Sequence, residues 1–185
     1  FGSMFRYENP QKNRYREFNQ AGVEIVGLVD IYSDFQIIND SFNFINELIP
    51  KTKLNINTIG SISDREEYIK VLYEYFHKNI DKLSQDSIDK LEKNTLRILD
   101  SNNPDDSEVI INAPNISEYI NENSKNNFSK LLELLDSANI EYNIDNSLVR
   151  GLDYYNDLTF EFTTSENVVV GGGGRYDNLA EILSL

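Results

Sequence analysis

A helical segment interrupts a chain whose other parts have the pattern of β-structure. Between residues 62 and 139 the apolar side chains recur at helical spacing, as in Ile69, Leu72, Phe76 and Ile80. Residues 61–150 carry 10 basic and 18 acidic side chains, a net charge of −8. This part is therefore predicted to be an acidic, all-α unit, with helices at residues 64–80, 84–94 and 117–138.

The flanking parts alternate polar and apolar residues, which is typical of half-buried strands. Residues 5–7 and 14–27 are predicted to form an antiparallel hairpin, followed by a helix that Pro50 stops. Further strands are expected at 54–58, 140–144, 153–164 and 167–171. The fold class is therefore α+β, with a mainly antiparallel sheet and flanking helices. We divide the chain into a first core part (1–61), the helical insertion (62–139) and a second core part (140–185).

Composition excludes several kinds of chemistry. The chain of 185 residues has no cysteine, which excludes disulfides and thiolate sites, and His77 is its one histidine. The formal net charge of −14 argues against non-specific nucleic-acid binding by bulk charge. No run of roughly 20 apolar residues could span a bilayer, and no signal peptide is visible. Both ends have the pattern of an interrupted domain, so a fragment of a longer protein is expected.

The first chemical cluster is a basic hairpin in this acidic chain. It places four cations between Phe5 and Phe18, namely Arg6, Lys12, Arg14 and Arg16. Arginine donors suit phosphate oxygens, Phe18 offers a flat face for a base, and Glu8 offers an acceptor. The hairpin could hold a nucleotide, or it could be a solvated hairpin that balances acidic neighbours.

Two further clusters lie in the last 40 residues. In the first, Arg150 precedes the tyrosines 154 and 155, and such an arginine needs partners if it is buried. It could serve a ligand, or form a structural ion pair with Asp153 or another carboxylate. The second is Gly171–Gly174 followed by Arg175, Tyr176 and Asp177. It lacks the phosphate-binding and dinucleotide fingerprints, so it is either a strand end packed closely on a ligand or another strand, or a flexible turn.

In this order, the clusters resemble the histidyl-tRNA synthetase family of class II aminoacyl-tRNA synthetases. The stretch Phe5–Phe18 is similar to class II motif 2 in its histidyl form. The run Leu148–Tyr155 is similar to the Arg-Gly-Leu-Asp-Tyr-Tyr signature, and Gly172–Asp177 to the second histidine-specific signature. Leu96–Ser101 resembles part of the family's insertion domain. The resemblance implies a class II synthetase-type sheet.

The resemblance also implies site residues. Catalytic roles fall to Arg150 and Arg6, and ATP binding to Arg6, Glu8, Arg14 and Phe18. Histidine binding falls to Gln20, Glu24, Arg150, Tyr154, Tyr155, Gly172, Gly173 and Tyr176. It further implies ATP with Mg²⁺ and no metal held by the protein, with histidine and histidine tRNA as partners. A cytoplasmic homodimer without membrane contact is expected for the full-length protein.

Two other functions remain open at this point. The regulatory subunit of ATP phosphoribosyltransferase resembles these synthetases but senses histidine without charging tRNA. The nucleotide residues Arg6, Glu8, Arg14 and Phe18 favour the synthetase. The chain could also be a non-catalytic binding module. Because class II motifs 1 and 3 are not found in it, we expect the isolated chain to charge tRNA weakly or not at all.

Overall fold

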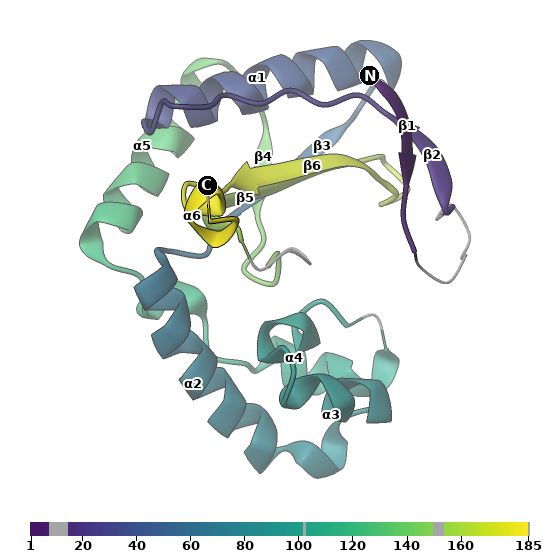
Figure 1. Ribbon diagram of the computed structural model, residues 1–185, viewed down its shortest axis with the longest axis vertical. Helices are drawn as coiled ribbons and strands as arrows, with labels where there is room; N and C mark the ends of the chain where they lie inside the picture. Colours follow the sequence, from purple (N-terminus) through teal and green to yellow (C-terminus); the bar gives the residue numbers. More distant parts are fainter. Residues whose placement is uncertain (8–14, 102, 150–153, 185) are drawn as a thin grey trace.

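The computed structural model describes residues 1–7, 15–101, 103–149 and 154–184. Its strands are β1 (Gly2–Phe5), β2 (Glu17–Gln20), β3 (Lys53–Thr58), β4 (Tyr142–Ile144), β5 (Asn156–Thr163) and β6 (Val169–Arg175). Its α-helices are α1 (Ile31–Leu48), α2 (Ile62–Lys78), α3 (Gln85–Leu91), α4 (Ser107–Ile111), α5 (Glu122–Ser137) and α6 (Leu179–Ile182). Short 3₁₀ turns lie at Ile80–Lys82, Thr95–Ile98, Pro104–Asp106 and Ile116–Glu118. Figure 1 shows the sheet beneath α1, with α2, α3 and α4 gathered on the opposite side of the view.

A four-stranded sheet forms the centre of the β-rich part of the molecule. Its strands lie in the order β4-β3-β5-β6. The β3–β5 and β5–β6 pairs are antiparallel, and β3–β4 is parallel. This confirms the predicted α+β class with a mainly antiparallel sheet. In the register of β3 and β5, Leu54 lies opposite Phe162 and Ile56 opposite Phe160. All four side chains are buried, so this face of the sheet is apolar.

Helices α1 and α5 cover that apolar face (Figure 1). Ile38 of α1 and Leu131 and Leu135 of α5 are fully or almost fully buried against the sheet residues. Each helix begins at a side-chain cap: Asp30 accepts from the Ser33 amide, and Asn121 accepts from the Ser124 amide. The caps therefore fix where the two helices meet the sheet.

Helices α2, α3 and α4 share a second apolar core. Tyr68, Leu72 and Phe76 of α2 are buried with Ile98, Val109 and Ile116 from the following turns and helices. Ser61 and Asp64 form a reciprocal capping box at the start of α2. The proposed subdivision at 61 and 139 stays a prediction; α5 belongs to the sheet's core rather than to this helical core.

Two local predictions need correction, and one alternative that the sequence left open is decided. The predicted strand 14–27 continues only through β2, because its pairing with β1 ends at the Gly2–Gln20 pair and residues 21–30 have no strand partner. The predicted helix 117–138 begins later, at Glu122, because Asn121 caps it there. Residues 171–174 lie inside β6 rather than in a flexible turn, because they pair with β5.

No helix within the described ranges is both long and apolar enough to cross a membrane.

Candidate functional site

Three tyrosines converge where β5 begins and β6 ends. The ring centroids of Tyr154 and Tyr155 are 5.0 Å apart, and that of Tyr176 lies 6.1 Å from Tyr154 and 6.5 Å from Tyr155. Tyr155 is buried, whereas Tyr154 and Tyr176 are half-buried. The cluster therefore combines aromatic surface with hydroxyl groups that can donate or accept hydrogen bonds.

Glu24 joins this cluster from the connection between β2 and α1. The Tyr176 hydroxyl donates a hydrogen bond to Oε1 of Glu24, with an O–O distance of 2.7 Å. Burial, together with this bond to the carboxylate, raises the pKa of Tyr176 to about 12. A carboxylate has two oxygens with several acceptor positions, so Glu24 can accept a further hydrogen bond from a ligand.

The glycines of β6 let this strand lie close to the aromatic residues of β5. A Cβ atom on Gly173 would come within 2.8 Å of Cζ of Phe160. A Cβ atom on Gly174 would come within 2.6 Å of the Leu158 carbonyl oxygen and 2.8 Å of Cδ1 of Tyr155. Side chains at these positions would push β6 away from β5 and displace Tyr155. The neighbouring Gly172 pairs with Glu161 in the same ladder.

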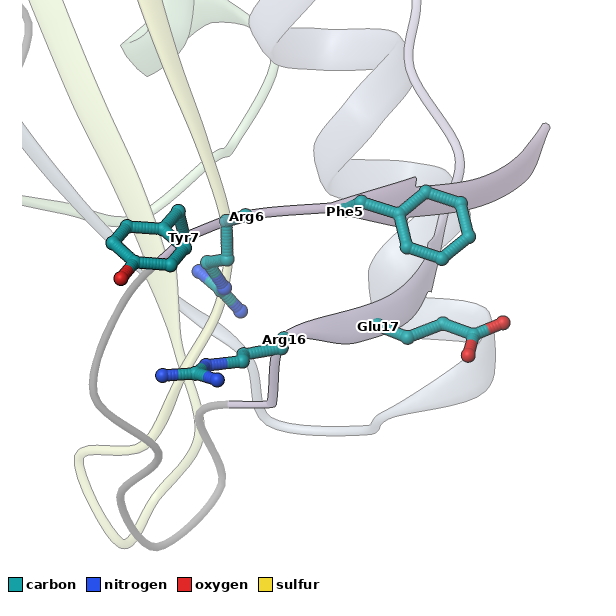
Figure 2. A pocket seen from close by; sticks show the side chains of 5 residues that line it. All are labelled: Phe5, Arg6, Tyr7, Arg16 and Glu17. Atoms are coloured by element: carbon teal, nitrogen blue, oxygen red, sulfur yellow. The ribbon is translucent and has the colours of Figure 1, made fainter.

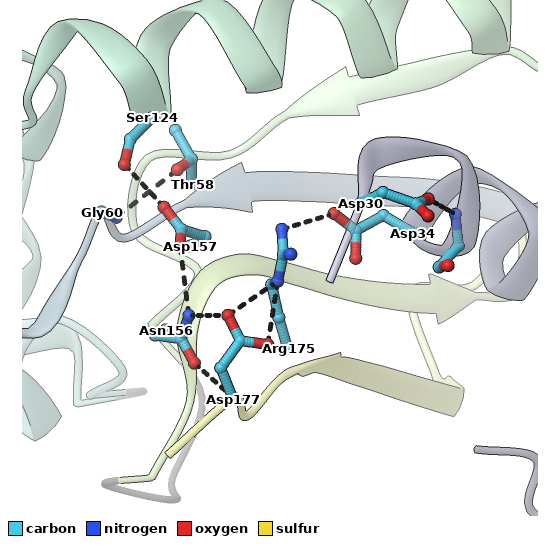
Figure 3. Close-up of polar contacts among 10 residues, drawn as sticks. Asp30, Asp34, Thr58, Gly60, Ser124, Asn156, Asp157, Arg175 and Asp177 are labelled. Carbon is cyan, nitrogen blue, oxygen red and sulfur yellow. Dashed lines mark hydrogen bonds and ion pairs between the residues drawn. The ribbon is translucent and has the colours of Figure 1, made fainter. Parts of the chain in front are cut away.

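A partly buried polar network surrounds Arg175, the residue before Tyr176 (Figure 3). Arg175 forms ion pairs with Asp34 of α1, at 3.1 Å, and with Asp177, at 3.0 Å. Asn156 donates to Asp177 from Nδ2, at 3.1 Å, and accepts from the Asp177 amide, at 2.8 Å. Burial raises the pKa of Asp34 to about 6, against the opposing effect of Arg175. Arg175 is thus held between carboxylates from two different elements.

The β1–β2 hairpin presents a second group of polar and aromatic side chains (Figure 2). The Arg6 guanidinium lies over the Phe18 ring, 4.1 Å from its centroid, and Arg6 Nε donates to the Tyr15 carbonyl. The Arg16 guanidinium lies 5.4 Å from the ring centroid of Tyr7. A cavity of about 380 Å³ is lined by Phe5, Arg6, Tyr7, Arg16 and Glu17. It therefore offers two guanidinium groups for anion binding.

The structure brings part of the predicted site together. Glu24, Tyr154, Tyr155 and Tyr176 form one group, and Arg6 and Phe18 form another. Gln20 ends β2 with an exposed side chain, opposite Gly2. The predicted residues Glu8, Arg14 and Arg150, and the proposed Arg150–Asp153 ion pair, lie outside the described residues. The site assignments as a whole stay predictions.

The sequence reading did not single out Asp34 or Asn156. Asp34 lies in the first turn of α1, where a carboxylate is common because its negative charge interacts favourably with the positive end of the helix dipole. Its contact with Arg175 spans 141 positions, and no local pattern marks such a pair. Arg175 and Asp177 lie within the stretch similar to the second histidine-specific signature, but that signature predicts no contact for them.

Comparisons with known proteins agree over almost the whole chain. The family model described as histidyl-tRNA synthetase matches residues 1–184. The histidine–tRNA ligase of Francisella philomiragia is 46% identical over 187 residues, which is 98% of this chain and 44% of that protein. The histidine–tRNA ligase of Mycoplasma mobile is 43% identical over 99% of this chain and 42% of its own length. The chain thus spans less than half the length of these curated relatives.

Solved structures show the same similarity. The apo histidyl-tRNA synthetase of S. aureus superposes with a TM-score of 0.73 and 32% identity, over 99% of this chain and 44% of that one. A Bacillus halodurans protein described as an ATP phosphoribosyltransferase regulatory subunit/histidyl-tRNA synthetase gives a TM-score of 0.60. Its identity is 21%, over 97% of this chain and 51% of that one, so it supports the fold alone.

Fold and sequence together place the chain in the class of the aminoacyl-tRNA synthetases, to which the matched relatives belong. Within that class, the chain belongs to the histidyl-tRNA synthetase family.

Proposed function

We propose that this chain is the histidine- and ATP-binding part of a histidine–tRNA ligase. The enzyme joins histidine to the α-phosphate of ATP and releases pyrophosphate, then transfers the histidyl group to the 3′ end of histidine tRNA and releases AMP. The observation that carries the proposal is the convergence of Glu24 with the tyrosines 155 and 176. The family assignment supplies the reaction.

Histidine recognition follows from the chemistry of its side chain. A neutral imidazole has one N–H donor and one acceptor nitrogen. In our proposal the Glu24 carboxylate accepts from the donor, and the Tyr155 hydroxyl donates to the acceptor. Tyr176 occupies one oxygen of Glu24, at 2.7 Å, and so directs the other toward the ligand. A site that bonds both nitrogens rejects amino acids of similar size that lack them by several orders of magnitude.

Activation brings a carboxylate toward an already charged phosphate. A carboxylate oxygen of histidine forms a bond to the α-phosphorus, and the bond to pyrophosphate breaks. We propose that Arg6 and Arg150 stabilise the negative charge that gathers on the α-phosphate oxygens. Glu8 is proposed to accept from the adenine amine, and Arg14 to contact the γ-phosphate. Mg²⁺ enters as the complex of the substrate ATP.

The position of Arg6 is relevant to ATP binding. Its guanidinium covers one face of the Phe18 ring at 4.1 Å. An adenine that stacks on that face must displace Arg6, which frees the guanidinium for the α-phosphate. Nucleotide binding and the charge-stabilising step are therefore linked through one side chain in our proposal.

The wider assignments of the protein are proposals of the same kind. We propose Gln20, Tyr154, Gly172 and Gly173 as further parts of the histidine pocket, a homodimeric complete protein and a cytoplasmic location. We also propose the division into core parts 1–61 and 140–185 around the helical insertion 62–139.

Histidine-dependent ATP–pyrophosphate exchange tests the proposed function. The assay uses the complete polypeptide that contains these residues, its Glu24→Gln and Arg150→Ala variants, and Glu133→Gln on the exposed side of α5 as control. We expect exchange by the parent and the control, and a loss of about a hundredfold, or about 2.7 kcal/mol, in each of the other variants. A folded parent without exchange would contradict the synthetase assignment. Histidine binding in that protein would then favour the regulatory-subunit function.

A further inference from the structure

The segment from Glu24 to the start of α1 contacts two adjacent residues at the end of β6. At one end Glu24 accepts a hydrogen bond from Tyr176, at 2.7 Å. Ten residues later Asp34 pairs with Arg175, at 3.1 Å. Residues 21–30 between β2 and α1 form no helix or strand. These two contacts therefore tie the segment to the residues around Tyr176 on both sides.

The Asp34–Arg175 pair is well shielded from water. The side chains are 13% and 11% exposed, so the attraction between them is screened less than that of a surface pair. The guanidinium is also bound through Nε to Asp177, at 3.0 Å. A planar guanidinium that binds two carboxylates in different directions has a fixed orientation.

The second carboxylate is itself fixed to the sheet. Asn156 is directly opposite Arg175 in the β5–β6 register. It donates from Nδ2 to Asp177, at 3.1 Å, and accepts from the Asp177 amide, at 2.8 Å. Both residues that flank Tyr176 in sequence are thus immobilised by hydrogen bonds and ion pairs. Tyr176 has little freedom to move away from Tyr155.

We propose that Asp34 and Arg175 are positioning residues for histidine binding. Their ion pair holds the start of α1 against the end of β6, so that Glu24 meets the Tyr176 hydroxyl and presents its second oxygen to the imidazole. The inference rests on the proposed function, because it assigns a purpose to the Glu24–Tyr176 pair. Neither Asp34 nor Arg175 touches the ligand in this scheme.

A spectroscopic signal of Tyr176 tests the positioning directly. The complete polypeptide is labelled with tyrosine carrying ¹³C at Cζ, and the Tyr176 resonance is assigned by its loss in Tyr176→Phe. Glu24→Gln defines the change in chemical shift when the bond to the carboxylate is lost. We expect Asp34→Asn to move the resonance in the same direction by at least roughly half as much. An unchanged resonance in a folded Asp34→Asn variant would overturn the inference.

A matched control separates positioning from general damage to α1. Asp30→Ser removes the same charge from the same helix start and keeps a good capping residue, but Asp30 forms no ion pair with Arg175 in the described contacts. We expect it to leave the Tyr176 resonance in place. If Asp34→Asn does not fold, Arg175→Lys gives the same test, because a lysine keeps the charge but cannot bridge both carboxylates.

Ligand affinity provides the second measurement. We expect Asp34→Asn to weaken histidine binding roughly tenfold, by analogy with residues that orient the ligands of a metal ion, with ATP affinity unchanged within about twofold. Calorimetric titration with each ligand separates the two. Unchanged histidine affinity would overturn the inference while the proposed function stands. A wild-type protein that does not bind histidine would overturn the proposed function, and with it this purpose for the ion pair.

Discussion

The backbone of Gly60 accepts a hydrogen bond from that of Asp157, between the end of β3 and the start of α2. The Asp157 amide donates to the Gly60 carbonyl, and the Ile59 amide donates to the Asp157 carbonyl, each at 2.7 Å. The Asp157 side chain also accepts from Ser124 Oγ, at 2.6 Å (Figure 3). One residue, two positions after Tyr155, therefore holds both the segment that leads into α2 and the start of α5.

We predict that Gly60→Ala destabilises the protein by roughly 2–4 kcal/mol. Gly60 has a φ of +66°, and an added Cβ would lie 2.6 Å from Cγ2 of Ile120 and 2.9 Å from Oδ2 of Asp64. Denaturant unfolding measures the loss. Gly2→Ala is the control, because a Cβ there meets nothing within 4 Å. Equal effects of the two substitutions would contradict the prediction.

Asp106→Asn should destabilise the helical part formed by α2, α3 and α4 by about 2–4 kcal/mol. The buried Asp106 carboxylate accepts from the Ser84 amide and from the hydroxyls of Ser84, Ser87 and Ser101, at 2.6–2.9 Å. Burial alone would raise the pKa of Asp106, but these bonds outweigh it and lower the pKa below its ordinary value. An asparagine replaces one accepting oxygen with an NH₂ group.

The control for Asp106→Asn is the same substitution at the exposed neighbouring residue, Asp105→Asn. Because the folded pKa of Asp106 is lowered, its stabilising contribution is present above the unfolded pKa and is lost as pH falls through the folded pKa. Thermal unfolding at neutral pH should show a large effect for Asp106→Asn alone. Similar melting of both variants would contradict the role of the carboxylate.

The stability cost of Asp34→Asn should decrease as pH rises. The folded pKa of Asp34, about 6, is above its ordinary value of 3.8, so the folded state binds this proton more tightly. The contribution of Asp34 to the unfolding free energy therefore falls as pH rises from about 4 to about 6, by up to about 3 kcal/mol. Urea unfolding between pH 4 and pH 8 compares wild type, Asp34→Asn and the exposed Asp40→Asn. A cost that grows with pH would contradict the raised pKa.

Basic residues at and after α3 should contribute to tRNA binding. Replacing Lys90, Lys93 and Arg97 by alanine is expected to weaken the affinity for histidine tRNA and to flatten its dependence on salt, because fewer phosphates are neutralised. Filter binding at several salt concentrations measures both. In the control, three other lysines in and just after α2 are replaced by alanine, namely Lys70, Lys78 and Lys82. Unchanged affinity of the first variant would exclude this surface.

Much of the fold was predictable because its signals are local. The helical spacing around Leu72 and Phe76 lies within the helix that it specifies. The strand status of Gly171–Gly174 could not be read in this way. It depends on pairing with β5 and on the phenylalanine rings that fill the space of the missing side chains.

The candidate site divides along the same line. Tyr154, Tyr155 and Tyr176 stand in short motifs, so a resemblance could propose them. The Asp34–Arg175 pair joins residues 141 positions apart, and an acidic residue in a first helical turn has an ordinary local explanation. Only the packing of α1 beside the end of β6 reveals that contact.

The close approach of Phe160 to Gly173 also has an evolutionary consequence. The ring occupies the volume that a side chain on the neighbouring strand would need. An alanine at 173 that is harmful beside phenylalanine should be tolerated beside a smaller residue at 160, so the two effects are not additive. A side chain at position 173 can therefore be accepted only after residue 160 has become smaller. The order of the two mutations decides which path a lineage can take.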